Sequence, residues 1–167
     1  KGSRLITHQK QLAGAELALA NFYASGVLAL GDKTGPFLWQ LPPSLAFDAA
    51  RVEAFLDLLP RDSAEAEQLA GKHDQHLERG ALTRAAAPCR YRHAFEVRHP
   101  SFFTPAFFRL LERRGAGFVI ADTAGAFREN RSEEVAPVRS GGADRARARR
   151  ARAPASDGAA RSPHPAR

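Results

Sequence analysis

The stretch that decides the fold is "HAFEVRHPSFFTPAFFRLLERRGAGFVIAD", residues 93–122. It opens with "HAFEVRH", typical of a strand, and closes with "GFVIAD", which is apolar almost throughout and also indicates a strand. Between them the sequence predicts a helix, with Thr104 as its N-cap, Pro105 in its first turn and Gly115 as its stop. Two apolar strands joined by a helix are typical of neighbouring parallel strands in an α/β sheet.

The upstream sequence predicts one more strand and three more helices. A helix over residues 12–31 would end at Gly31, and "PFLWQLPP" predicts a strand over residues 37–41 that is buried on both faces. In "FDAARVEAFLDLLP", Asp48 suits an N-cap ahead of an apolar stripe, which comprises Val52, Phe55, Leu56 and Leu59. "RDSAEAEQLAGKHDQHL", residues 61–77, predicts a surface helix capped by Asp62 or Ser63.

The order strand, helix, helix, strand, helix, strand predicts a parallel α/β sheet. No GxGxxG or Walker sequence follows any of the strands, which disfavours a nucleotide-binding open sheet. A partial TIM-type (β/α) barrel is therefore the favoured fold for residues 1–127.

Residues 128–167 differ sharply in composition from the rest of the chain. They contain no aromatic residue, no Leu and no Ile, and Ala, Arg, Gly and Pro make up 27 of the 40. We expect a disordered tail here, either a natural basic arm or, as the preferred explanation, the product of a reading-frame error in GC-rich DNA. Of the net charge of +7, the tail carries +5 and residues 1–127 carry +2, so the high pI is weak evidence for nucleic-acid binding by the folded part.

Composition also bears on the cellular setting. Cys89 is the single cysteine, so no internal disulfide can form, and a reduced, cytoplasmic location is expected. No apolar run approaches the ~18 residues of a membrane span. The chain contains no methionine and begins at Lys1, from which we expect it to be part of a longer protein.

Residues 1–125 resemble the YecE-like family, domain of unknown function 72. The segments that carry the resemblance are "KGSRLITHQKQL", "GPFLWQLPPSLAFDAARVEAFLDLLP", "HAFEVRHPSF" and "ADTAG", in this order and spacing. The resemblance implies a TIM-barrel-like fold of which this chain holds about half, a fragment broken at both ends. It implies no particular reaction and no cofactor.

Polar residues gather at the predicted C-terminal ends of the strands, where parallel sheets and barrels bind ligands. Strand alternation puts Glu96 and Arg98 on one face, and His99 begins the following loop. One interpretation makes Glu96 and His99 acid/base groups and Arg98 an anion clamp. The other makes Glu96 and Arg98 a structural ion pair and places His99 in a turn.

Four further residues are candidates for the same site. Asp122 ends the third predicted strand and is assigned to acid/base work with Glu96, although "DTAG" also suits a turn. Gln40, at the end of the first strand, is assigned to ligand binding. By the family resemblance, Lys1 and His8 follow a strand on the same barrel face and would supply a cation and a titratable imidazole.

No metal site is assigned. His8, Glu96, His99 and Asp122 are suitable ligand types, but no local pair fixes a ligand spacing. The sequence favours an enzyme that acts on an anionic small molecule or phosphodiester at the barrel mouth. The alternative is a non-catalytic binding module, for nucleic acid or another ligand, with this chain an inactive fragment.

Overall fold

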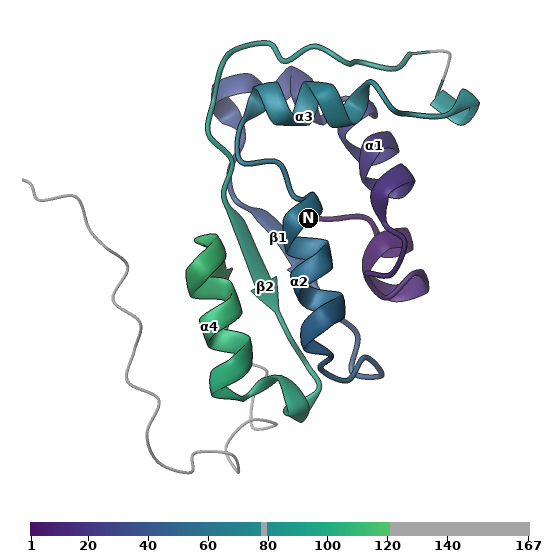
Figure 1. Ribbon diagram of the computed structural model, residues 1–167. Helices are drawn as coiled ribbons and strands as arrows, with labels where there is room; N and C mark the ends of the chain where they lie inside the picture. The colour runs from purple at the N-terminus through teal and green to yellow at the C-terminus, as the bar shows by residue number, and fades with distance from the viewer. Residues whose placement is uncertain (78–79, 121–167) are drawn as a thin grey trace, which may run out of the picture. The chain divides into compact units, whose positions relative to one another are not determined.

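A computed structural model describes residues 1–77 and 80–120, all within one compact unit, Lys1–Phe127 (Figure 1). Asp122 and residues 128–167 lie outside the described residues. In chain order the regular elements are a π-helical turn Leu5–Gln9, α1 (Glu16–Ala24), a 3₁₀ segment Val27–Lys33, β1 (Phe37–Gln40), α2 (Ala49–Leu58), α3 (Ser63–Ala70), a 3₁₀ turn Gln75–Leu77, β2 (His93–Glu96), a 3₁₀ turn Pro100–Phe102, α4 (Pro105–Arg114) and β3 (Gly117–Phe118).

The three strands form one parallel sheet in the order β1-β2-β3. Gln40 lies opposite Glu96, and Phe95 lies opposite both Trp39 and Phe118. The protein is therefore mixed α/β with parallel strands joined by helices, as the strand–helix alternation predicted. The described strands make an open sheet of three.

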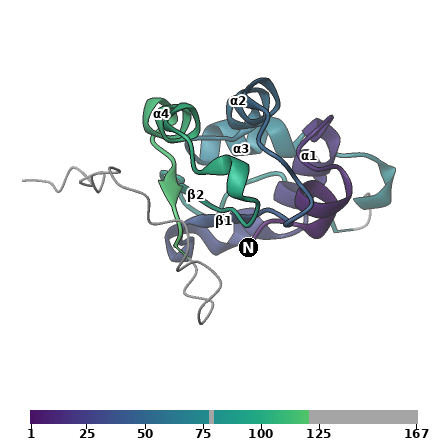
Figure 2. The same ribbon diagram turned by 90° about the horizontal axis from the view of Figure 1, so that it is seen from below.

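Helices α1, α2 and α4 lie on the same side of the sheet (Figure 2). The side chains of Trp39 and Phe95 point towards them and are fully buried. The rings of both residues pack edge-on against Phe55 of α2, and Trp39 also packs against Phe22 of α1. Trp39 is therefore part of the core between the helices and the sheet.

The predicted caps are present. The side chains of Asp48, Asp62 and Thr104 accept hydrogen bonds from backbone N–H groups in the first turns of α2, α3 and α4. Gly115 ends α4 with a left-handed φ of 62°, a conformation that favours glycine. These local signals fix where the helices start and stop, and so where the strands between them lie.

Two of the predicted helices are shorter than expected. The helix predicted over residues 12–31 ends at Ala24, because Gly26 takes a φ of 106° and the chain continues as a 3₁₀ segment. The helix predicted over residues 61–77 ends at Ala70, where the N–H of Gly71 donates to the Glu67 and Leu69 carbonyls. In both cases the helix ends just before a glycine that the hydrophobic pattern had placed inside the predicted helix.

The strands are also shorter and less buried than predicted. In β1 only Phe37 and Trp39 are buried, while Leu38 and Gln40 on the opposite face are half-buried. β3 has two residues, and the side chain of Ile120 beyond it is 82% exposed. The prediction that the strands are buried on both faces was wrong. The described helices cover one face of the sheet (Figure 2), and β3 pairs with β2 alone among the described strands.

Candidate functional site

Glu96 is the centre of a hydrogen-bonded cluster at the C-terminal end of β2. Its neighbour in register, Gln40, ends β1, and the Gln40 Nε2 donates to Glu96 Oε1 at 2.6 Å. Arg98 donates to the same oxygen from Nε at 3.3 Å and from Nη2 at 3.1 Å. Glu96 is only 7% exposed, whereas the Arg98 side chain is 43% exposed. The Glu96 and Arg98 side chains therefore lie side by side, although β2 ends at Glu96 and Arg98 lies beyond it.

Lys1 joins this cluster from the start of the chain. Its Nζ donates to Gln40 Oε1 at 2.6 Å, so one amide side chain links Lys1 to Glu96. The next residue, Gly2, donates its backbone N–H to the Leu38 carbonyl at 2.8 Å. The N-terminal segment therefore lies along the edge of β1 that is not paired with β2, and this position brings Lys1 to the strand end.

The surroundings of Glu96 favour its ionised form. Burial raises the pKa of the carboxyl, but the hydrogen bonds from Gln40 and Arg98 and the positive charges of Arg98 and Lys1 outweigh this, and its pKa lies below the usual value. All three donors converge on Oε1.

His8 belongs to the same electrostatic neighbourhood. It is half-buried, and its Nδ1 lies 2.8 Å from the hydroxyl of Thr7, which itself donates to the Ser3 carbonyl at 3.2 Å. Burial lowers the pKa of the imidazole, and the positive charges of Arg4, Lys1 and Arg98 lower it further. The structure thus brings together Lys1, His8, Gln40, Glu96 and Arg98 from three separate segments of the chain.

His99, a predicted acid/base group, is engaged in a turn. Its Nδ1 lies 2.7 Å from the Ser101 hydroxyl and accepts the Ser101 backbone N–H at 3.2 Å. The Ser101 hydroxyl also accepts the backbone N–H of Phe47 at 2.7 Å. Through Ser101, His99 therefore connects the loop before α4 with the loop before α2. This is the turn role that the sequence left open, and within the described residues no hydrogen bond joins His99 to the Glu96 cluster. Asp122, the remaining predicted acid/base group, lies outside the described residues.

Two residues that sequence reasoning did not select help to build the site. Gly2 packs so tightly on Trp39 that a Cβ added to it would lie 2.4 Å from the indole ring. Thr7 is 2% exposed and contacts His8 through its hydroxyl. Nothing in the sequence marked either residue, because no strand or helix was predicted from the residues of this segment.

A groove of about 590 Å³ lies at the opposite end of the strands, between the C-terminal ends of α2 and α4, and is lined by Leu56, Leu59, Arg61, His93 and residues 112–116. Two of its three arginines are paired across the two helices. Arg113 contacts Glu53 at 3.3 Å and Arg114 contacts Asp57. These two guanidinium groups are therefore part of helix packing.

Two further features are absent from residues 1–77 and 80–120. No group of three or more His, Cys, Asp and Glu side chains in this part of the chain is placed to hold a metal ion. No helix in it is long and apolar enough to cross a membrane.

Comparison with known proteins gives a family and no activity. A family model described as "Protein of unknown function DUF72" matches residues 1–161, which extends past residue 125, where the resemblance of the sequence motifs ends. No curated protein matches the chain, and no solved structure matches it either. The matched model covers nearly the whole chain and is that of the family which the motifs from "KGSRLITHQKQL" to "ADTAG" indicated. The chain belongs to the DUF72 family.

Proposed function

We propose that the cluster around Glu96 is the ligand site at the C-terminal mouth of a TIM-type barrel, and that it binds an anionic small molecule or phosphodiester. Arg98 and Lys1 bind the anion, and Glu96 is the acid/base group. The observation that carries the proposal is the hydrogen bonding of Gln40 and Arg98 to one buried carboxylate at the strand ends, with Lys1 bound to the same Gln40 side chain.

The arrangement of the described elements supports the barrel. The strands follow one another in chain order across a parallel sheet, and α1, α2 and α4 lie on one side of it. A doubly wound open sheet reverses its strand order and places helices on both faces, whereas a barrel keeps one order and one helical layer. In a barrel the opposite face, with Gln40 and Glu96, is the inner one. The proposed barrel domain is residues 1–127.

The balance of charge supports an anionic ligand. Lys1, Arg4 and Arg98 act electrostatically on His8, and Glu96 is the one carboxylate hydrogen-bonded within the cluster as described. Arg98 directs two of its N–H groups at Glu96. Because a guanidinium group has five N–H donors, the remaining donors are available to other acceptors. Planar forked donors of this kind suit phosphate and carboxylate groups.

His99 and Asp122 complete the proposal as acid/base candidates. His99 accepts at Nδ1 from Ser101, so a neutral His99 carries its proton on Nε2 and would act as an acid. Asp122 would share proton transfer with Glu96. Both assignments derive from their positions after predicted strand ends.

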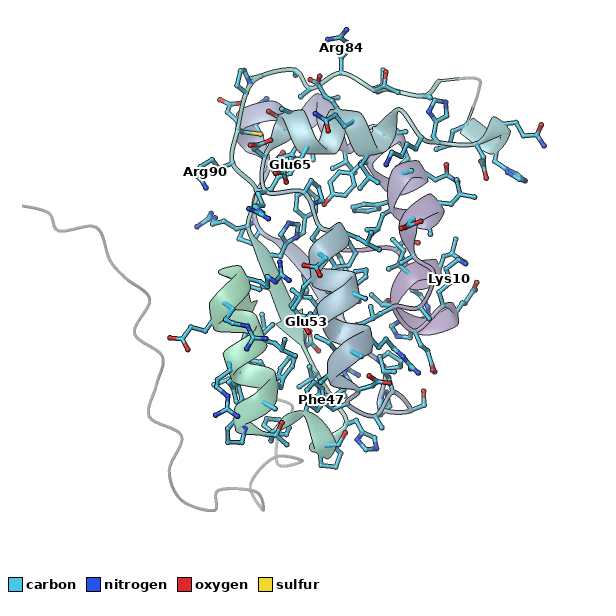
Figure 3. The ribbon with its side chains drawn as sticks, viewed as in Figure 1. Lys10, Phe47, Glu53, Glu65, Arg84 and Arg90 are labelled. Atoms are coloured by element: carbon cyan, nitrogen blue, oxygen red, sulfur yellow. The ribbon has the colours of Figure 1, made fainter. Side chains whose placement is uncertain are left out.

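Calorimetric titration of the full chain with inorganic phosphate and with dimethyl phosphate tests the proposal. Arg98→Gln is expected to weaken binding by about tenfold or more, the scale of one hydrogen bond to a charged group. Arg84→Gln is the matched control, because Arg84 points away from the body of the protein and its side chain is 90% exposed (Figure 3). We expect it to bind as the wild type does.

Three results would contradict the proposal. Phosphate binding that is absent in the wild type would exclude an anion site. Equal losses in Arg98→Gln and Arg84→Gln would indicate general charge attraction. A lowered free energy of unfolding in Arg98→Gln with unchanged binding would make Glu96 and Arg98 a structural ion pair.

A further inference from the structure

The hydrogen bonds around Thr7 determine which nitrogen of His8 is basic. The Thr7 hydroxyl has a single proton, which it donates to the Ser3 carbonyl, an acceptor with no proton to give. With that proton directed at the carbonyl, the 2.8 Å contact between Thr7 Oγ1 and His8 Nδ1 has Nδ1–H as its donor. In this arrangement a neutral His8 carries its proton on Nδ1 and has a free electron pair on Nε2.

The charges that face His8 oppose its protonation in the absence of a ligand. Arg4 lies in its own segment, Lys1 approaches along β1, and Arg98 comes from the end of β2. Glu96, the carboxylate of the cluster, is hydrogen-bonded to Arg98 and does not act on the pKa of His8. An anion bound among these cations would cancel part of their field, so the charged imidazole would become more favourable.

We infer that His8 takes up a proton on Nε2 when the site binds an anion, and that Thr7 is the positioning residue that holds the imidazole for this. The inference rests on the proposed function, because the anion is the ligand proposed for the Glu96 cluster. The proton comes from solvent and adds to the Nε2 electron pair, and the Nδ1–H remains on Thr7. Because linkage is reciprocal, anion affinity rises as the pH falls.

Sulfate is the probe of choice, since its charge does not change near neutral pH. We expect the full chain to take up protons on binding sulfate, measured by calorimetry in two buffers of different ionisation enthalpy. The affinity should increase as the pH falls, by at most about tenfold per pH unit for one proton. His8→Gln should lose this uptake. His76→Gln, at a histidine whose side chain is 80% exposed and away from the site, should retain it.

Nitrogen-15 NMR of the imidazole tests the role of Thr7 separately. Ligand-free wild type should show the tautomer with the proton on Nδ1 of His8. Thr7→Val, which keeps the shape of the side chain but removes the hydroxyl, should lose that preference, and Thr7→Ser should restore it.

The outcomes separate the two proposals. Sulfate binding without proton uptake, or with uptake unchanged in His8→Gln, would overturn the role of His8 and leave the anion site standing. A ligand-free His8 with its proton on Nε2 would overturn the role of Thr7. Failure of sulfate to bind at any pH would overturn both this inference and the proposed function.

Discussion

Gly2 is the residue that lets the N-terminal segment reach the site. Its backbone N–H donates to Leu38, and its Cα rests on the ring of Trp39, which is fully buried and cannot move aside without disturbing the core. Lys1, one residue earlier, depends on this contact to reach Gln40. A methyl group added at Gly2 would therefore disturb the position of Lys1 in the site.

Gly2→Ala should displace the N-terminal segment. The added Cβ would lie 2.4 Å from Trp39, and overpacking of this kind lowers the free energy of unfolding by about 1–3 kcal/mol. Phosphate affinity should fall as well, because Lys1 loses its position. Gly35→Ala is the matched control, since nothing lies within 4 Å of its added Cβ. Urea unfolding that gives equal stabilities for the two variants would refute the tight contact.

Single residues also show what the sequence can predict about a site. Alternation along β2 was enough to place Glu96 and Arg98 on one face, and the parallel register added Gln40. The family resemblance supplied Lys1 and His8. Gly2 and Thr7 could not be found this way, because their roles depend on contacts with an indole ring and an imidazole that only the folded chain brings near.

His93 joins three elements through its two ring nitrogens. Nδ1 accepts the indole N–H of Trp39 in β1 at 3.2 Å, and Nε2 lies 2.8 Å from the carbonyl of Pro60, between α2 and α3. A carbonyl only accepts, so Nε2 carries the proton and the ring is neutral. Protonation at Nδ1 would break the bond to Trp39 and leave a fully buried indole N–H without its partner.

The stability of the protein should therefore decrease in mild acid. Burial lowers the pKa of His93 from its ordinary value of 6.5, and the Pro60 carbonyl offsets this only in part. The stabilising contribution of neutral His93 is fully present above about pH 6.5, and it is lost as the pH falls from there through the lowered pKa. Urea unfolding of the wild type at several pH values measures this loss.

Two variants identify the histidine responsible for that decrease. His93→Gln should be less stable near neutral pH and should show a weaker dependence on pH. His8→Gln should show how much His8, whose pKa is also lowered, adds to the same trend. An unchanged pH dependence in His93→Gln would contradict the assignment.

Among the secondary-structure elements, helix ends marked by a capping residue were predicted better than strand lengths. Asp48, Thr104 and Gly115 act through backbone groups next to them in the sequence, so their effect is local and readable. Strand length depends on neighbours. β3 is short because β2 is its one partner within the described residues. The residues "GFVI" alone do not show how many neighbouring strands they will have.

For the molecule as a whole, the sheet has two different faces. One is covered by α1, α2 and α4 and holds the aromatic core, and the other carries Leu38, Gln40 and Glu96. Strand–helix alternation predicted the parallel α/β architecture, because it depends on the order of elements. It did not predict which face the helices would leave open, because apolar strands look alike whether one face or both are covered.

NMR chemical-shift mapping of the full chain with inorganic phosphate tests the central claim most directly, because it locates the ligand without any variant. The account predicts that the largest shifts fall on Lys1, Gly2, His8, Gln40 and residues 96–98, at the C-terminal ends of the strands. Shifts concentrated on Arg61 and residues 112–116, in the groove at the other end of the sheet, or spread evenly over exposed basic residues, would contradict it.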